Sequence, residues 1–506
     1  MSKELDKLME SANEAFQNQD YTQAETRYKA AMWEAERSGS PLSVAICLDR
    51  LAEVYFEQGR YDESEPLYRR ALEVRENQLD PQHEDIVQSL NNLSAVYFFL
   101  EQYDKAEPIC TRLTEIYEKV LGPDNPEVAT SYNNLALLYA AQQKYGAAEA
   151  LYKRSLELKT QALGSDHPEV GDIMHNLGTL YMSEERHDEA ADMLRNALKV
   201  LEGELGSVHP DLEPLLFSLA TVAEKTGNGI ESVKMYERIL SIKEVHLGPT
   251  HEDVIDLIKQ VANAYARLAK HQEAERFYKR ALAIKERSQG KKSPEGAELL
   301  SYLGRLYREQ NKLPQAESFF NEALMICEQA CGPRHRETEL RLRDLAAFYQ
   351  SFNRHVKAEP IWKRVVEIKE KTVGKDHPEY LEASLEYAVC LSEQKKYNEA
   401  EPIMRELLST SQRVLGPEHC DVGLIMHYLA EVLSQTNRHA EAEDLYKRAI
   451  DVKTRALGPQ DVSVASSLFG YAKLLESTYR EAEAEHMKMC AQAILDSERA
   501  AQLSNR

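Results

Sequence analysis

The sequence lacks the features that mark most enzymes and membrane proteins. It has no glycine-rich phosphate loop, no G-x-S-x-G nucleophile motif and no paired-cysteine redox motif. Its most apolar short run, Leu93 to Leu100, is far shorter than the roughly 20 residues needed to span a bilayer. Its start, MSKELDKLMES, contains no apolar segment of a secretory signal. We therefore expect a cytoplasmic protein without catalytic activity and without membrane insertion.

Basic residues are too few for a nucleic-acid-binding protein. The chain has 62 Lys and Arg against 84 Asp and Glu, a net charge of −22. Such a surface repels a phosphate backbone. We expect no nucleic-acid partner.

Cysteines are sparse and do not form a metal set. The chain has seven, of which Cys327 and Cys331 are four residues apart without a His or Cys pair nearby to complete a zinc site. Cys110 occupies the position that Tyr152 has in the next repeat, and Cys390 that of Leu138. The cysteines are interpreted as free thiols, and neither a metal nor a cofactor is expected.

What the sequence has in abundance is internal repetition. The stretch from Gly122 to Leu163 returns 42 residues later, from Gly164, with the same pattern of large and small residues. Its turn glycine keeps this period without drift at Gly206, Gly248, Gly290, Gly332, Gly374, Gly416 and Gly458, and Asp80 stands one period earlier. A fixed period of this length is typical of repeat architectures.

One repeat predicts two antiparallel helices. Val128, Tyr132, Leu135 and Tyr139 form one apolar stripe at helical spacing, and a second stripe begins at Ala148. The positions of Ala136 and Ala148 hold only Ala, Ser or Gly in the other repeats, which allows helices to approach closely. The fold is therefore predicted to be all-α.

The spacing of Tyr132, Leu135, Ala136, Tyr139, Ala148, Tyr152 and Ser155 resembles the tetratricopeptide signature. The phrases NNLALLY, AEALYKRSLELK and LGSDHPEV are similar to the kinesin-light-chain variety of that repeat, although no long heptad segment precedes the repeats. The predicted fold is a right-handed superhelical α-solenoid of antiparallel helix pairs, in which each unit contacts mainly its neighbours.

The frame of the repeat also predicts the organisation of the chain. Residues 1–37 are expected to form an abbreviated helix pair, with a register two residues off the later frame. Eleven 42-residue units should then form one continuous solenoid over residues 38–496, with the polar last unit as its cap. Residues 497–506 are expected to be a frayed tail.

A histidine recurs at one site in the linker just before the first helix of seven repeats. The copies are His83, His167, His209, His251, His335, His377 and His419. Helix packing separates neighbouring copies by at least about 8–10 Å, too far for one metal ion to bind two of them. These histidines are interpreted as capping and packing residues.

Amide pairs recur in three consecutive repeats and give the sharpest functional hypothesis. They stand at matching positions of the first helices: Asn91 and Asn92, Asn133 and Asn134, His175 and Asn176. The family resemblance implies that first helices line a groove, where such an amide contacts the backbone of a bound peptide. An amide both donates and accepts hydrogen bonds. The alternative is that these side chains bond to neighbouring helices and set the superhelical pitch.

Two classes of function follow from these observations. The first is a monomeric scaffold or adaptor whose groove binds peptide segments of partner proteins. The alternative is a regulatory sensor, in which a peptide or small ligand changes the superhelical pitch. Ligand-dependent compaction in small-angle scattering distinguishes the sensor from the scaffold.

Overall fold

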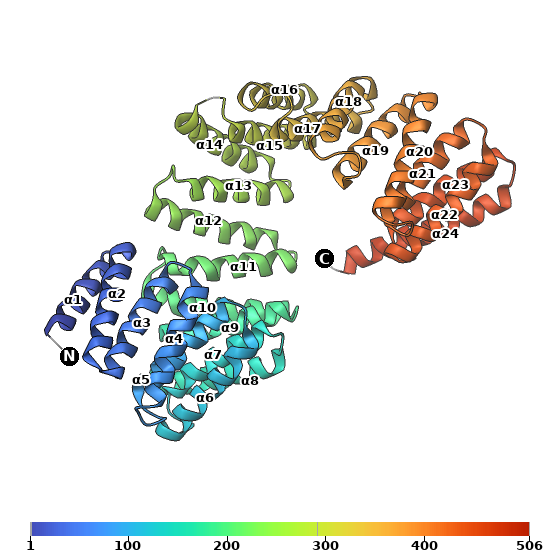
Figure 1. The fold of residues 1–506 in the computed structure, drawn as a ribbon. Coiled ribbons are helices and arrows are strands. Elements are labelled where there is room, and N and C mark those ends of the chain that lie inside the picture. Colours follow the sequence, from blue (N-terminus) through green and yellow to red (C-terminus); the bar gives the residue numbers. More distant parts are fainter. Residues whose placement is uncertain (1–2, 291, 505–506) are drawn as a thin grey trace. The chain divides into compact units, whose positions relative to one another are not determined.

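The computed structural model describes residues 3–290 and 292–504, and every regular element in these ranges is a helix (Figure 1). Contacts divide the chain into two compact units, Met1–Ile242 and Lys243–Arg506. Within each unit, consecutive helices pack as antiparallel pairs joined by short turns. This confirms the predicted all-α fold of repeated helix pairs. That eleven units form one continuous array stays a prediction.

Odd-numbered helices are the first and even-numbered helices the second of each pair. The first unit contains α1 Lys3–Gln17, α2 Tyr21–Ser38, α3 Pro41–Glu57, α4 Tyr61–Glu76, α5 Glu84–Phe99, α6 Tyr103–Leu121, α7 Val128–Ala141, α8 Tyr145–Leu163, α9 Pro168–Ser183, α10 His187–Leu205, the 3-10 helix η1 Pro210–Leu212 and α11 Glu213–Lys225. α12 Gly229–Leu247 contains the division between the units. The second unit contains α13 Glu252–Arg267, α14 His271–Gln289, α15 Pro294–Glu309, α16 Leu313–Ala330, α17 Arg336–Ser351, α18 His355–Thr372, α19 Pro378–Glu393, α20 Tyr397–Val414, α21 Cys420–Gln435, α22 His439–Leu457, α23 Val462–Ser477 and α24 Glu481–Ser504.

The two ends of the chain can be compared with the expected organisation. α2 ends at Ser38, beside the boundary that the sequence places after residue 37. α24 continues to Ser504 and so passes through most of the segment, 497–506, for which a frayed tail is expected. Residues 505 and 506 lie outside the described residues.

The recurring glycine is required by the backbone at the end of the second helix. Gly122, after α6, has φ 86° and ψ 149°, and Gly164, after α8, has φ 90° and ψ 163°. Residues with a Cβ rarely adopt this region. No atom lies within 4 Å of a Cβ built at either position, so conformation and not space selects glycine. Asp80 takes this position after α4, which stops earlier, at Glu76.

The recurring histidine caps the next first helix, as the sequence predicts. In each copy Nδ1 accepts a hydrogen bond from the backbone N–H two residues later, at 3.2 Å for His83 and 3.3 Å for His167. The same bond is made by His209, His251, His335, His377 and His419. It satisfies one of the N–H groups that a helix start leaves without a partner.

Small residues lie where the helices of a pair cross. Ala136 on α7 and Ala148 on α8 are completely buried. At the position of Ala136 in the next pair, a Cβ added to Gly178 would lie 2.7 Å from Cγ of Leu194. The close helix approach predicted from these positions is therefore confirmed.

A three-residue latch joins each of several helix pairs to the next one. In the latch of α8 and α9, Tyr181 donates its hydroxyl to Glu149 at 3.0 Å, and Arg186 binds the other carboxylate oxygen at 3.0 Å. The Arg186 guanidinium also lies over the Tyr181 ring. Hydrogen bonds from Arg186, Lys153 and Tyr181 lower the pKa of Glu149 to about 2. Related Tyr–Glu bonds join Tyr97 to Glu65, Tyr307 to Glu275, Tyr349 to Glu317 and Tyr471 to Glu443.

Removing the carboxylate of this latch should destabilise the fold measurably. We expect Glu149→Ala to lower the free energy of unfolding by about 1–2 kcal/mol, because it removes charge-assisted hydrogen bonds between two helix pairs. Urea denaturation measures this loss. The matched control is Glu157→Ala on the same helix, whose ion pair with Arg154 is exposed and should contribute at most about 0.5 kcal/mol. Equal losses for the two variants would contradict a structural role of the latch.

One junction in the first unit has none of the latch residues. Between α10 and α11 the 42-residue period places Ala191, Ala223 and Asn228 at the positions of Glu149, Tyr181 and Arg186. The first helix there is also split into the 3-10 helix η1 and the shortened α11. This junction is therefore held by packing and by other bonds.

Candidate functional site

The amide pairs lie on three consecutive first helices of the first unit. Asn91 and Asn92 are on α5, Asn133 and Asn134 on α7, and His175 and Asn176 on α9. Asn134 is exposed, and the other five side chains are half-buried. We call Asn91, Asn133 and His175 the first amide position, and Asn92, Asn134 and Asn176 the second amide position.

Several of these side chains bond to protein neighbours. Asn176 donates to the carbonyl oxygen of Asn133 at 3.1 Å, and Nε2 of His175 lies 3.2 Å from the hydroxyl of Ser218 on α11. Each bond joins the first position of one helix to the second position of the next. The contact between repeats is therefore diagonal, and it stabilises the stacking of α7, α9 and α11. Asn92 accepts a bond from Gln88 of its own helix at 2.9 Å.

Asn91 and Asn134 are the exceptions to this pattern. Within the described residues, neither side-chain amide has a hydrogen-bond partner, although the diagonal rule would pair them with each other. Both instead line a pocket between α5, α6 and α7. Their donors and acceptors thus remain available to a ligand.

The pocket has a volume of about 440 Å³ and a largely apolar lining. Its polar rim contains Asn91, Asn134 and Glu127. The other lining residues are Ser94, Ala95, Phe98, Phe99, Ala106, Cys110, Tyr117, Thr130, Ser131, Leu137 and Leu138. Apolar walls with a few polar groups are typical of binding pockets.

The pocket arises from a substitution in the repeat. At the position of Cys110, six other second helices bury an aromatic ring, and these rings are Tyr68, Tyr152, Tyr278, Phe320, Trp362 and Tyr446. Two others bury the aliphatic side chains of Leu194 and Met404 there. Tyr152 is 1% exposed and fills the space between α7 and α8. A thiol in place of a ring leaves that space open beside Cys110. The sequence contains this signal, since Cys110 is already recognised there as the counterpart of Tyr152.

Aromatic rings also crowd the edge of the pocket. Phe99, at the end of α5, is 53% exposed, and its ring stacks on that of Tyr61 with centroids 5.1 Å apart. Phe56 and Phe98 pack edge-on against the ring of Phe99. An exposed aromatic cluster next to an apolar pocket favours binding of an apolar group there.

On the matching face of the second unit, ion pairs join neighbouring first helices. Arg305 on α15 binds Asp344 on α17, and Arg343 on α17 binds Glu382 on α19. These pairs line a cavity of about 410 Å³ that also contains Arg341, Gln350, Trp362 and Glu386. Among the described residues, Nε of Arg341 and Oδ2 of Asp344 in this cavity are buried without a hydrogen-bond partner.

His427, on α21, occupies the first amide position in the second unit and titrates abnormally. It is 8% exposed, and its Nδ1 has no partner. Burial, together with the positive charges of Lys453 and Lys473, lowers its pKa from 6.5 to about 4. Between these values the unfolded chain binds more protons than the folded one, so stability rises with pH.

Acid should therefore destabilise the second unit through this residue. We expect the free energy of unfolding of the wild type to fall, between pH 7 and pH 4, by about 3 kcal/mol more than that of His427→Asn. Asparagine is chosen because the corresponding position of another repeat holds Asn133. Denaturant titrations of both proteins at a series of pH values measure the difference. Parallel pH profiles would contradict the assignment.

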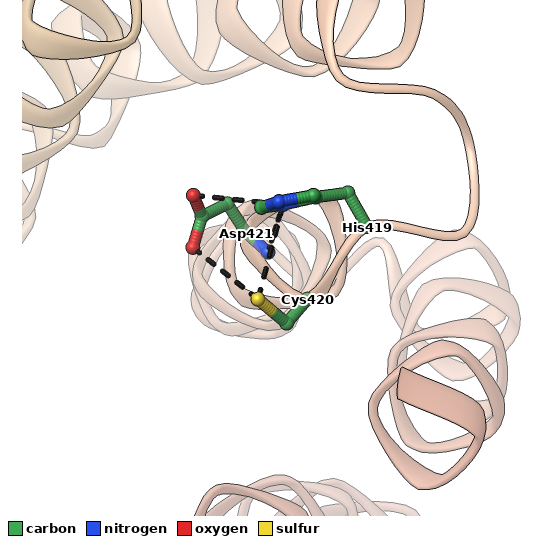
Figure 2. Close-up of side chains that lie close together, drawn as sticks. All are labelled: His419, Cys420 and Asp421. Atoms are coloured by element: carbon green, nitrogen blue, oxygen red, sulfur yellow. Dashed lines mark hydrogen bonds and ion pairs between the residues drawn. The ribbon is translucent and has the colours of Figure 1, made fainter. Parts of the chain in front are cut away.

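His419, Cys420 and Asp421 bring three metal-binding side chains together at the start of α21 (Figure 2). Sγ of Cys420 lies 3.8 Å from Nδ1 of His419, and Nδ1 lies 3.6 Å from a carboxylate oxygen of Asp421. However, that nitrogen already accepts the capping bond from Asp421 N–H. Similar His–Asp contacts occur without a cysteine at His83 and His209. A helix start also disfavours a cation, so capping accounts for the cluster.

Comparison with known families decides the nature of the repeat. The family model described as tetratricopeptide repeat matches residues 8–77, 43–119, 85–161, 127–203, 211–287, 257–329, 337–413, 381–455 and 421–497. The chain belongs to the tetratricopeptide repeat family. Repeats of this family generally serve as protein-interaction modules and usually have no catalytic role. Within the described residues, none of the helices of this repeat protein could cross a membrane.

Solved structures that match this repeat protein have low sequence identity to it. BtubC (BKLC) from P. vanneervenii is 24% identical, with a TM-score of 0.39, and the match covers 45% of this chain and 92% of that one. A putative kinesin light chain of Podosopora anserina with nearly identical TPR-like repeats is 22% identical, with a TM-score of 0.35, covering 39% and 94%. The apo form of RapI is 14% identical, with a TM-score of 0.40, covering 56% and 98%. No curated protein matches significantly.

Proposed function

We propose that this protein is a non-enzymatic scaffold that binds an extended peptide segment of a partner protein on the first-helix face of α5, α7 and α9. The observation that carries the proposal is the pocket beside Cys110, with the unpartnered amides of Asn91 and Asn134 at its rim. An apolar side chain of the peptide enters the pocket, and the amides bond to the peptide backbone.

Both amides can bond to a backbone without selecting its side chains. An extended peptide presents N–H and C=O groups that have no partner of their own. Asn91 and Asn134 are positioned on neighbouring helices on either side of the same pocket. Asn133 and Asn176, by contrast, are occupied with each other. The proposal therefore assigns the peptide contact to Asn91 and Asn134, and a stacking role to Asn133, His175 and Asn176.

A random dodecapeptide library displayed on phage tests this proposal. Selection on the immobilised protein should recover peptides that share one large apolar residue. We expect the double variant Asn91→Ala with Asn134→Ala to bind a recovered peptide about 5- to 150-fold more weakly, since each lost hydrogen bond costs about 0.5–1.5 kcal/mol. Fluorescence polarisation measures the affinity.

The matched control is Asn92→Ala, which removes an amide of the same helix that bonds to Gln88. It should change the affinity less than twofold. Thermal melting of all variants should stay close to the wild type, because Asn91 and Asn134 support no core contact. Selection that recovers no peptide, or equal affinities for the double variant and the control, would reject the proposed function.

A further inference from the structure

Three consecutive first helices carry no lysine or arginine at all. The sequences of α5, α7 and α9 contain His175 as their only residue of basic type. Acidic groups are present on the same helices or directly before them. They are Glu84, Asp85, Glu127, Glu169 and Asp172. The face that surrounds the pocket is therefore negatively charged.

Three of these carboxylates, Glu84, Glu127 and Asp172, form no ion pair among the described residues. Glu127 lines the pocket, and Asp172 lies one helical turn before Asn176; both are exposed. Glu169, by contrast, is bound to Lys159 at 2.6 Å. Local desolvation and the negative charges of Glu169 and Asp211 raise the pKa of the Asp172 carboxyl. A bound cation would relieve this repulsion.

Ion pairs between first helices compensate some of the acids in the second unit, whereas, among the described residues, α5, α7 and α9 form none with one another. In the second unit Arg305 on α15 pairs with Asp344 on α17, and Arg343 on α17 pairs with Glu382 on α19. α19 and α21 themselves contain no lysine or arginine. Exposed acids on second helices are also commonly paired, as Glu63 is with Arg60 and Glu189 with Arg186. The face of α5, α7 and α9 has no such internal cation.

We propose that the peptide bound on this face carries a lysine or arginine beside the apolar residue that enters the pocket. The inference rests on the proposed function and adds the charge of the partner segment. The basic side chain contacts Glu127 or Asp172, which accept its N–H groups. Complementary charge of this kind raises the association rate and excludes acidic competitors.

The sequences recovered from the peptide library test this inference. Lysine and arginine should be enriched next to the shared apolar residue. For one recovered basic peptide, we expect Glu127→Gln with Asp172→Asn to weaken binding about two- to thirtyfold at low salt, as two exposed ion pairs allow. High salt should reduce the difference between this variant and the wild type.

A charge-matched control separates local contact from the general attraction of an acidic protein. Asp104→Asn with Asp188→Asn removes the same net charge from exposed positions at the starts of α6 and α10. It should change the affinity less than twofold. Equal losses of affinity in this control and in Glu127→Gln with Asp172→Asn would overturn the inference. Recovered peptides without enriched lysine or arginine would also overturn it. Either result leaves the proposed function standing. Recovery of no peptide at all would remove both.

Discussion

Replacing Cys110 with tyrosine should weaken peptide binding strongly while the protein keeps or gains thermal stability. The ring would occupy the pocket between α5, α6 and α7, as Tyr152 occupies the matching space in the next pair. Peptide affinity should fall by about 30- to 1000-fold, because the apolar side chain that fills a central pocket typically contributes about 2–4 kcal/mol. Fluorescence polarisation with a recovered peptide measures the loss.

The melting temperature supplies the second half of this test. A ring buried in the pocket removes apolar surface from water, which should stabilise the fold by about 1.5–3 kcal/mol. The control is Cys110→Ser, which keeps the pocket open and should bind peptide as the wild type does. Unchanged affinity in Cys110→Tyr would show that the pocket does not receive the peptide. Melting below the serine variant would show that the pocket does not fit a ring.

The reciprocal change, Tyr152→Cys, should have the largest effect on stability. Tyr152 is 1% exposed, so removing its ring leaves a cavity between α7 and α8. Losses of a buried aromatic ring cost about 3–5 kcal/mol, and we expect a loss in this range from urea denaturation.

Lys153→Ala provides the control at the neighbouring residue of the same helix. The Lys153 side chain is 58% exposed and pairs with Glu149 one turn away, so its loss should cost at most about 0.5 kcal/mol. A small loss in Tyr152→Cys would mean that the flanking helices close over the missing ring. The absence of a ring at Cys110 would then not be sufficient to explain its pocket.

Much of the fold could be predicted because backbone requirements repeat along the chain. The glycine at Gly122 is needed for a conformation that other residues avoid, and the histidine that precedes seven of the first helices caps them. Both signals depend on local chemistry, so a single sequence reveals them. The helix pairs and the buried alanines follow from the same period.

The candidate site could be predicted only in part. The amide positions are visible in the sequence, but their pairing is not. Neighbouring first helices pack so that the first amide position of one helix faces the second amide position of the next. Asn176 therefore bonds to Asn133. The same offset would pair Asn134 with Asn91, but within the described residues neither amide has a hydrogen-bond partner. The pocket could not be predicted from the sequence either, since neighbouring side chains can fill the space beside a cysteine at a core position or leave it open. That outcome depends on the packing of Phe98, Leu138 and their surroundings.

The missing latch between α10 and α11 has a consequence for the order of folding during synthesis. Each earlier junction in the first unit has a polar clasp, at Tyr55 with Glu25, Tyr97 with Glu65, Lys144 with Glu107 and Tyr181 with Glu149. A repeat protein gains stability from one neighbour at a time, so the segment up to α10 can become stable before α11 leaves the ribosome. During synthesis we therefore expect a folding intermediate in which the helices up to α10 are folded. The side of α10 that contacts α11 in the complete protein is still exposed in this intermediate.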